Sequence, residues 1–473
     1  MTAAPAIEYV DASLWRSTVS AAVERGAEFD GLYAAHTEHG PAVRLALRQG
    51  AARRLLSARA TDSRLETVVD LLPAAEWDER EARDTHSVRF DGHEPLRPLV
   101  AHPADRATWV TPVEGPDVHE VAVGPIHAGV IESGHFRFHV VGERVLHLDL
   151  RLFYKHRGLE LAAEGLTLAA GLPVAQRACA ACAVANTVAY AQAAESLLGL
   201  EPDEDLRRSR TVLLELERLY NHLHDLSALC AGIGFDPGTM TFAALKERAQ
   251  RLNERVGGHR FLFGTVRVGE GILSVDDATA ADARRELESL GREAADAWRT
   301  LTFMAAAEDR FRGVGFLSQE DAERWGAAGP VARASGVHRD ARTDDPGLLW
   351  YPGLQPARPE QPSGDVAARA EVRAVELEHT CIMVSGLLAA PPGPGRALPA
   401  RDPGALGVGR VESPRGATVC CVEAAGDHIT RMHLRTGSYA NWPVLARVVP
   451  RAILPDFPLI NKSFELCYAC VDR

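Results

Sequence analysis

Two Cys-x-x-Cys pairs decide how this chain must fold. The first lies in Arg177-Ala178-Cys179-Ala180-Ala181-Cys182, and the second lies in Leu466-Cys467-Tyr468-Ala469-Cys470. Four thiolates that converge in one fold indicate a metal site. In a zinc ribbon the second pair follows the first closely, whereas here most of the chain separates the two. A large domain must therefore bring them together.

Composition narrows the class of protein. The chain has 473 residues, of which 46% are hydrophobic and 25% charged, as is ordinary for a globular protein of two or three domains. A net charge of -12 provides no global basic field, so we expect no nucleic-acid partner. The most apolar stretch, residues 166–190, contains Gln176, Arg177 and Asn186, so no transmembrane segment is expected.

Cysteine usage and the N-terminus indicate the compartment. The first residues include Glu8 and Asp11 and lack the basic and apolar regions of a signal peptide. Eight cysteines in a long chain without a secretion signal favour the cytoplasm, where thiols stay reduced. Paired cysteines in that setting more often bind metal or perform redox chemistry than form disulfides.

The N-terminal part is expected to be a small domain that combines helix and strand. Residues 1–72 show a helix-like Ala/Arg/Leu/Glu periodicity with a strand-like break at residues 64–72. A charge-dense segment at 76–84 and a Gly/Pro turn at 90–95 follow. We therefore predict a small α/β domain over residues 1–100, a linker over 101–118 and a main domain over 119–473.

The main domain is predicted to be a helical bundle with a β-rich part, which makes the fold class α+β. Alternation over residues 119–150 predicts a hairpin that turns at Gly142, and alternation over 408–435 predicts a strand pair around Gly426-Asp427. Helical patterns cover residues 158–230, 241–257, 280–307 and 366–388. The Pro- and Gly-rich segments 327–365 and 391–403 are expected to be loops.

The first cysteine pair lies at the start of an Ala-rich helix. The helix dipole there favours thiolate over thiol, which is the form that binds metal. Four thiolates suit zinc, an iron–sulfur cluster or nickel, and the spacing does not choose among them. Core cysteines without a ligand are the plainer alternative, and a disulfide is a weaker one.

Several motifs together resemble the large subunit of NiFe hydrogenases, in the membrane-associated branch related to complex I and typified by formate hydrogenlyase. The resemblance covers residues 119–473 and rests on both cysteine motifs and on five further stretches: residues 124–136, His156-Arg157-Gly158-Leu159-Glu160, Glu217-Arg218-Leu219-Tyr220-Asn221-His222, Val411-Glu412-Ser413-Pro414-Arg415-Gly416 and Ser438-Tyr439-Ala440-Asn441-Trp442-Pro443. Residues 76–99 also resemble the C-terminal part of the small complex I subunit (30 kDa type) that is fused to the large one in formate hydrogenlyase, here shortened.

The resemblance implies a nickel ion held by Cys179, Cys182, Cys467 and Cys470. Cys182 and Cys470 would also bridge to an iron that carries CO and cyanide ligands. Arg415 matches the family arginine whose guanidinium overhangs the open metal position; as a rival interpretation it would be a surface arginine after Pro414.

Glu132 occupies the region of the family's proton-relaying glutamate. A carboxyl near a buried metal relays protons if burial lifts its pKa towards neutrality. The alternative is an ordinary loop carboxylate.

The chain departs from the family pattern at three places around the cysteines. Ala180 replaces a glycine, Asn186 replaces a frequent histidine, and Glu465-Leu466 replaces an Asp-Pro pair. Groups around the ligands tune metal affinity and reactivity, so these changes bear on turnover more than on metal binding. The sequence stops at Arg473, about where a family protease would cut, so no tail is expected to need removal.

The expected function is interconversion of protons plus electrons with H₂. By resemblance, electrons arrive through a separate iron–sulfur subunit, because the paired cysteines of this chain are used by nickel. Membrane subunits of the same complex would hold the chain at the cytoplasmic face of the membrane. Two alternatives stay open, namely a quinone-reactive complex I subunit and a structural subunit. The complex I tyrosine three residues after the equivalent of Arg177 is Ala180 here, which favours the hydrogenase.

The other cysteines and histidines are expected to be structural. Cys230 and Cys381 lie in apolar helical patterns, and Cys420 and Cys421 should point to opposite faces of a strand. His222 and His224 should face different sides of a helix, which disfavours a joint metal site.

Overall fold

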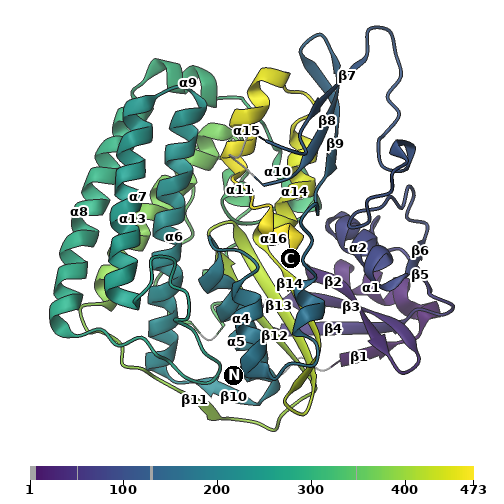
Figure 1. Ribbon diagram of the computed structural model, residues 1–473, viewed down its shortest axis with the longest axis horizontal. Helices are drawn as coiled ribbons and strands as arrows, with labels where there is room; N and C mark the ends of the chain where they lie inside the picture. Colours follow the sequence, from purple (N-terminus) through teal and green to yellow (C-terminus); the bar gives the residue numbers. More distant parts are fainter. Residues whose placement is uncertain (1–6, 51, 128–131, 348) are drawn as a thin grey trace.

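A bundle of long helices forms one side of the molecule (Figure 1). The computed structural model describes residues 7–50, 52–127, 132–347 and 349–473. Aspartates at the N-caps of three of the long helices, Asp203, Asp276 and Asp365, accept hydrogen bonds from free backbone N–H groups. The bundle helices are α6 (Glu204–Gly232), α7 (Asp236–Gly257), α8 (Asp277–Thr302) and α13 (Val366–Leu387). All four lie within the segments that the sequence predicts to be helical or overlap them.

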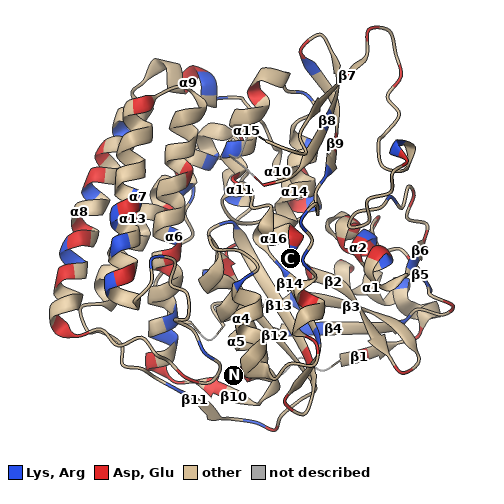
Figure 2. Ribbon diagram, in the orientation of Figure 1, with Lys and Arg blue, Asp and Glu red and all other residues tan. Residues whose placement is uncertain are grey.

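Helix α8 illustrates why these segments pack as they do. Its buried residues, Ala280, Ala283, Leu287, Leu290, Ala294 and Leu301, recur at helical spacing and face the bundle. Figure 2 shows charged residues of both signs along the rest of the helix. The described part of the chain contains no helix long and apolar enough to cross a membrane.

A three-stranded antiparallel sheet lies beside the bundle and supports the helix that follows the first cysteine pair. Its strands are β12 (Leu406–Ser413), β13 (Gly416–Ala425) and β14 (His428–Arg435), in that order. The predicted turn at Gly426-Asp427 is confirmed, but the strand pair is in fact three strands. Helix α5 (Ala183–Leu197) packs on β12, where a Cβ on Gly409 would lie 1.9 Å from the Ala189 carbonyl oxygen. Glycine therefore allows the close approach.

The N-terminal region contains more strand than the sequence predicts. Its four-stranded sheet has the order β1-β4-β3-β2 and consists of β1 (Ile7–Val10), β2 (Glu28–Thr37), β3 (Gly40–Gln49) and β4 (Ala52–Arg59). The helix-like interpretation of residues 1–72 is wrong over β2 to β4. These strands are buried on both faces, so their sequence lacks alternation. Leu32 and Leu45 pack on the N-terminal core, whereas Tyr33 packs on Val408 and Val419 of the other sheet.

Helices and short strands complete the N-terminal region. They are α1 (Trp15–Glu24), α2 (Glu76–His86) and the parallel pair β5 (Arg64–Glu66) and β6 (Arg89–Asp91). The predicted break at residues 64–72 thus holds one short strand. Helix α2 lies between this region and the rest of the chain.

The predicted hairpin at Gly142 is confirmed and belongs to a three-stranded sheet. Its strands are β7 (His119–Val123), β8 (His135–Val141) and β9 (Arg144–Arg151), in that order. Phe138 contacts Phe457 with ring centroids 4.7 Å apart, so the sheet packs on the segment that leads to the second cysteine pair. That segment comprises α14 (Gly437–Val448), α15 (Phe457–Phe464) and α16 (Ala469–Asp472).

The predicted loop 327–365 contains short helices. Arg333 and Arg342 lie in them and are fully buried in ion pairs, a long-range property that local composition does not reveal. The remaining elements are α3 (Leu159–Ala163), α4 (Leu168–Gln176), α9 (Ala305–Phe311), α10 (Gln319–Arg324), α11 (Gly329–Ala334), α12 (Ala341–Asp344), the pair β10 (Leu200–Pro202) and β11 (Ala397–Pro399), and 3-10 turns at Ala12–Leu14, Pro73–Ala75, Arg106–Thr108 and Leu454–Asp456.

Candidate metal centre

The fold brings the two cysteine pairs together. Cys179 Sγ lies 3.2 Å from Cys467 Sγ, and the sulfurs of Cys179, Cys467 and Cys470 all lie within 4.8 Å of one another. Cys182 lies beside Cys179 and Cys470, whose thiols donate hydrogen bonds that lower the pKa of Cys182 to about 6, but it is not one of the three sulfurs that lie within 4.8 Å of one another. Three sulfurs from opposite ends of the main domain thus lie together, with the fourth beside them.

A single arginine ties the two cysteine loops to each other. The Arg157 guanidinium donates to the carbonyl oxygens of Arg177 (2.8 Å) and Ala178 (2.8 Å) before the first pair, and of Ala469 (3.0 Å) within the second. Five donors in a fixed geometry let one arginine bridge several carbonyls. Sequence reasoning did not assign Arg157 a role, although it lies in one of the motifs that carried the resemblance.

Helix α6 supports the start of α5. Glu217 accepts hydrogen bonds from the backbone N–H groups of Val184 (2.6 Å) and Ala185 (3.0 Å), and Asn221 Nδ2 donates to the Ala181 carbonyl oxygen (2.8 Å). The two bonds to Glu217 satisfy N–H groups that the helix N-terminus leaves free, and the Asn221 bond holds the loop just before the helix. Burial raises the pKa of Glu217 to about 8 despite the two N–H donors. The Glu217–His222 motif therefore has a defined task, which is to fix the first cysteine loop.

The protonation of the thiols reflects their crowding. Hydrogen bonding to Cys179, together with burial, raises the pKa of Cys467 to about 12. Hydrogen bonds with the other three cysteines also raise the pKa of Cys470 above its ordinary value. Without a cation, four close sulfurs do not all ionise, because like charges repel in a buried site. A metal ion would replace the shared protons.

Arg415 is buried beside this site. It lies in the turn between β12 and β13 and is only 5% exposed, so the alternative of a surface arginine is wrong. Its Nη1 and Nη2 donate to Asp225 Oδ2 (2.6 Å) and Oδ1 (2.8 Å), and its charge contributes to the lowered pKa of Cys182. Burial alone would raise the pKa of Asp225, but Arg415, His222 and Arg373 hold it well below the usual range.

Glu132 also lies near the cysteines. It is half-buried, and burial followed by the nearby Cys467 raises the pKa of its carboxyl. Of the stretch 124–136 that carried part of the resemblance, residues 128–131 lie outside the described residues. The structure thus groups all six predicted site residues, namely Cys179, Cys182, Cys467, Cys470, Arg415 and Glu132, in one region.

The three departures from the family pattern have different surroundings. Ala180 offers its carbonyl oxygen to the Tyr220 hydroxyl (3.4 Å). Glu465 lies 3.5 Å from His224. Asn186, one helical turn after Cys182, is fully buried, and its side-chain amide has no hydrogen-bond partner among the residues described. Such a polar group is costly to bury without a partner, which fits a polar group bound beside it.

A second group of ionisable residues is held by arginines rather than by a metal. Glu81, Glu160 and His433 offer ligand atoms within 4.8 Å of one another. However, Arg473 donates to both carboxylates, and Arg431 Nη2 lies 2.9 Å from Glu160. These arginines already neutralise the site.

The other predicted structural residues behave as expected. Cys230 and Cys420 lie in the main core, and Cys421 lies in a separate cluster on the opposite face of its strand. His222 is fully buried and bonds Glu376 (2.8 Å), whereas His224 is largely exposed, so the two face different sides of α6.

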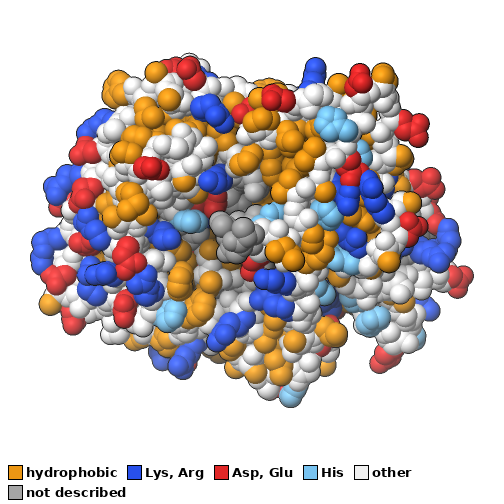
Figure 3. All heavy atoms as spheres, turned by 45° about the horizontal axis from the view of Figure 1, so that its top comes forward, with side chains coloured by type: hydrophobic (Ala, Val, Ile, Leu, Met, Phe, Trp, Pro, Cys, Tyr) orange, Lys and Arg blue, Asp and Glu red, His pale blue; other side chains and the backbone are white. Residues whose placement is uncertain are grey.

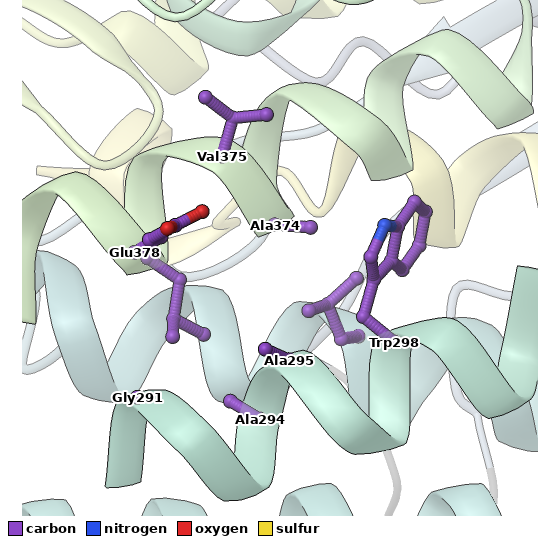
Figure 4. A pocket seen from close by; sticks show the side chains of 9 residues that line it. Gly291, Ala294, Ala295, Trp298, Ala374, Val375 and Glu378 are labelled. Atoms are coloured by element: carbon purple, nitrogen blue, oxygen red, sulfur yellow. The ribbon is translucent and has the colours of Figure 1, made fainter. Parts of the chain in front are cut away.

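The bundle also contains a small apolar cavity of about 110 Å³ between α8 and α13 (Figure 4). Ala294, Ala295 and Ala374 line it, with Trp298 at one end and Glu378 at the other. Nothing in its lining besides the Glu378 carboxylate could bind a metal ion. The four-cysteine centre therefore remains the principal chemical site.

Comparisons with known proteins agree with this geometry. Residues 233–401 and 399–473 match the family described as respiratory-chain NADH dehydrogenase, 49 Kd subunit, and residues 11–113 match the 30 Kd subunit family. Formate hydrogenlyase subunit 5 of Escherichia coli (strain K12) is 32% identical, over 86% of this chain and 76% of that protein. Hydrogenase-4 component G of the same organism is also 32% identical, over 87% and 76%.

A solved structure shares the fold. A chain of the membrane-bound sulfane sulfur reductase, an archaeal respiratory membrane complex, is 27% identical with a TM-score of 0.70 and covers 77% of this chain and 100% of its own length. The carbon monoxide-induced hydrogenase of Rhodospirillum rubrum is 29% identical over 75% of this chain and 99% of that protein. The chain is therefore an oxidoreductase subunit and belongs to the family of large subunits of membrane-associated NiFe hydrogenases related to complex I, fused to a 30 kDa-type N-terminal region.

Proposed function

We propose that this chain catalyses the reaction 2H⁺ + 2e⁻ ⇌ H₂ in a membrane-associated redox complex. The observation that carries the proposal is the meeting of four cysteines, three of them buried and Cys467 partly exposed, beside the fixed guanidinium of Arg415. Complex I subunits that act on quinone share the fold, but four clustered thiols have no use in quinone chemistry.

Nickel and iron fit this set of donors. Soft thiolates prefer soft metals, and the buried, unpartnered amide of Asn186 lies one turn from Cys182. In the proposal, Cys179, Cys182, Cys467 and Cys470 would hold a nickel–iron group whose iron would carry CO and cyanide ligands. When bound, this group supplies the redox centre at which hydrogen is formed or split.

The residues around the cysteines have separate tasks. Arg415 places a permanent positive charge at a fixed position, since Asp225 holds both ends of its guanidinium. Glu132 accepts and releases a proton at its carboxylate oxygens, a task for which a raised pKa suits it. Arg157 keeps the two cysteine loops at their mutual distance.

Electrons must reach the site from another subunit. We propose an iron–sulfur partner, through which membrane subunits hold this chain at the cytoplasmic face of a membrane. Large apolar side chains such as Ile126 and Phe303 are exposed, and Figure 3 shows apolar side chains gathered among charged ones on the face turned forward. Such patches favour contact with other proteins.

We also propose a division of the chain into residues 1–100, a linker at 101–118 and a main domain at 119–473. The separate N-terminal core around Trp15, Leu45 and Phe90 supports this division. Tyr33 packs against the sheet of the main domain, so the two parts are in contact. The proposed division therefore separates two sequence families and two cores, not two independent bodies.

Metal content and infrared spectra test the proposal. The complex purified with its maturation proteins should contain nickel and iron in equal amounts and show absorption bands of CO and cyanide. Cys182→Ser should lose both metals, because an alcohol oxygen is a poor substitute for a bridging thiolate. Cys230→Ser, a matched change of a buried core cysteine, should keep them. Absence of both metals from the wild type would favour a quinone-reactive or structural subunit instead.

A further inference from the structure

One face of helix α2 in the N-terminal region is charged, buried and aimed at the main domain. Trp77, Asp78 and Glu81 are at most 9% exposed, although the helix belongs to a different part of the chain from the cysteines. Asp78 accepts from Arg435 (3.0 Å), and the Trp77 ring meets Tyr439 edge-on at 5.7 Å. Glu81 lies on the same face and accepts hydrogen bonds from Arg473.

Two carboxylates hold Arg473 through its Nε and Nη2, whereas its buried Nη1 has no hydrogen-bond partner among the described residues. Its Nη2 donates to both oxygens of Glu81 (2.8 and 2.9 Å), and its Nε donates to Glu160 (2.8 Å). The guanidinium lies 4.6 Å from the centre of the Tyr439 ring. Since the Arg473 side chain is only 2% exposed, water does not replace a lost partner.

The same arginine lies close in sequence to the second cysteine pair. The single-turn helix α16 connects Cys470 to Arg473, and Asp472 offers its carbonyl oxygen to the Arg157 N–H (2.9 Å). Two sets of hydrogen bonds therefore hold this segment. The Arg157 N–H binds its backbone at Asp472, and Glu81 and Glu160 bind the Arg473 side chain. A single turn of helix transmits a shift of Arg473 directly to Cys470.

We propose that Glu81 is a positioning residue for the cysteine site, acting through Arg473 to hold Cys467 and Cys470 against Cys179 and Cys182. The N-terminal region, which in the related complex I proteins corresponds to a separate family of subunits, is then part of what shapes the metal centre of this chain. The consequence for metal loading rests on the proposed function, whereas the positioning itself does not.

The test uses the full chain made without metal and measures how fast each cysteine is alkylated, by mass spectrometry. Glu81→Gln keeps the side-chain size and removes the charge that Arg473 needs. We expect alkylation of Cys467 and Cys470 to accelerate about 10-fold or more, the scale expected when a local segment loses an anchoring buried ion pair. Cys230 and Cys381, buried in the bundle core, should keep their wild-type rates.

Glu76→Gln is the matched control. Glu76 lies on the same helix, but its side chain is 24% exposed and its partners Arg80 and Arg447 lie 3.4 Å away. In this variant the cysteines should be alkylated at the wild-type rates. If Glu81→Gln does not fold, Arg473→Lys replaces it, because lysine keeps the charge but cannot reach both carboxylates, and the same selective acceleration is expected.

Two results would overturn the inference: unchanged protection of Cys467 and Cys470, or acceleration of all buried cysteines together, which would mean general unfolding. In the matured complex, Glu81→Gln should contain at most about half of the wild-type nickel, with Glu76→Gln unaffected. A wild type that lacks nickel while the selective labelling persists would count against the proposed function alone. If Glu81→Gln contained the full amount of nickel and its Cys467 and Cys470 were alkylated at the wild-type rates, the result would count against this inference alone.

Discussion

Replacing Arg415 with lysine separates metal binding from turnover. The change keeps the positive charge near Cys182 but removes the two guanidinium N–H donors that bind the Asp225 carboxylate at 2.6 and 2.8 Å. An ammonium on a flexible stem keeps one of these bonds at best. The cost is therefore about one hydrogen bond to a charged group, or roughly 1.5–3 kcal/mol in the free energy of unfolding.

The effect on turnover should be larger than the effect on stability. Lysine does not hold its charge at the position that the guanidinium occupies beside the cysteine site. Loss of one preorganised electrostatic group commonly lowers kcat about 10²- to 10³-fold, and we expect a loss of that order in hydrogen uptake, evolution and isotope exchange. Nickel and iron content should stay close to the wild type, since all four sulfurs remain.

Arg410→Lys is the control for stability. Arg410 lies on strand β12, which leads into the turn that holds Arg415. It is also buried, and it pairs with Asp30 at 3.2 Å instead of with a residue at the cysteine site. It should lower the unfolding free energy without lowering turnover. Wild-type turnover in Arg415→Lys would refute the role of Arg415. A different result would be a wild type that binds both metals but neither evolves, consumes nor exchanges hydrogen. We would then attribute the missing activity to Ala180, Asn186 or Glu465.

Three further predictions concern a ligand, a buried carboxyl and the partner. Cys470→Ser should lose nickel and iron together, as measured by elemental analysis; retention of both metals would show that Cys470 is not a bridging ligand. In the metal-free chain, the pKa of about 8 for Glu217 means that the folded state binds an extra proton between pH 4.5 and pH 8, so stability should fall as pH rises through this window. Glu217→Gln should flatten that dependence in denaturant titrations, and parallel curves for both proteins would contradict a protonated Glu217. The purified chain should form a stable complex with its iron–sulfur subunit in size-exclusion chromatography, and turnover by the isolated monomer at the rate of the complex would contradict this.

Residues that act through local pattern were predicted well. The hairpin at Gly142 and the long helices follow from periodicity and capping, which neighbouring residues determine. The convergence of the cysteine pairs followed from their chemistry, since separate pairs without a shared ligand would have little purpose. Helical periodicity and the Cys-x-x-Cys spacing can thus be recognised from neighbouring residues alone.

Strands β2 to β4 were missed for a physical reason. An exposed strand alternates polar and apolar residues, but here Leu32 and Tyr33 are adjacent and both buried, one in each core. Burial on both faces removes the period-two signal. Only knowledge that the second sheet covers this one would have revealed it.

Long-range contacts of arginine were equally hidden from the sequence. Arg157, Arg333 and Arg473 each bind groups more than a hundred positions away or in another region of the fold. An arginine in a sequence carries no sign of its partner, and most arginines are exposed. Their roles became visible only when the structure placed carboxylates and carbonyl oxygens around them.

Hydrogen bonds between the thiols, with a smaller contribution from Arg415, lower the pKa of one cysteine of the site. Arg373 and Arg415 are both buried against Asp225, and the nearby Glu465 supplies a second negative charge, so the charges of these four groups balance. Arg415 lies near Cys182, where its charge makes a small addition to the hydrogen bonds from Cys179 and Cys470 that lower the thiol pKa to about 6, while burial and Glu217 act in the opposite direction. Hydrogen bonding within the cluster thus makes Cys182 a stronger acid than Cys467 and Cys470, so we expect Cys182 to release its proton to a metal ion most readily.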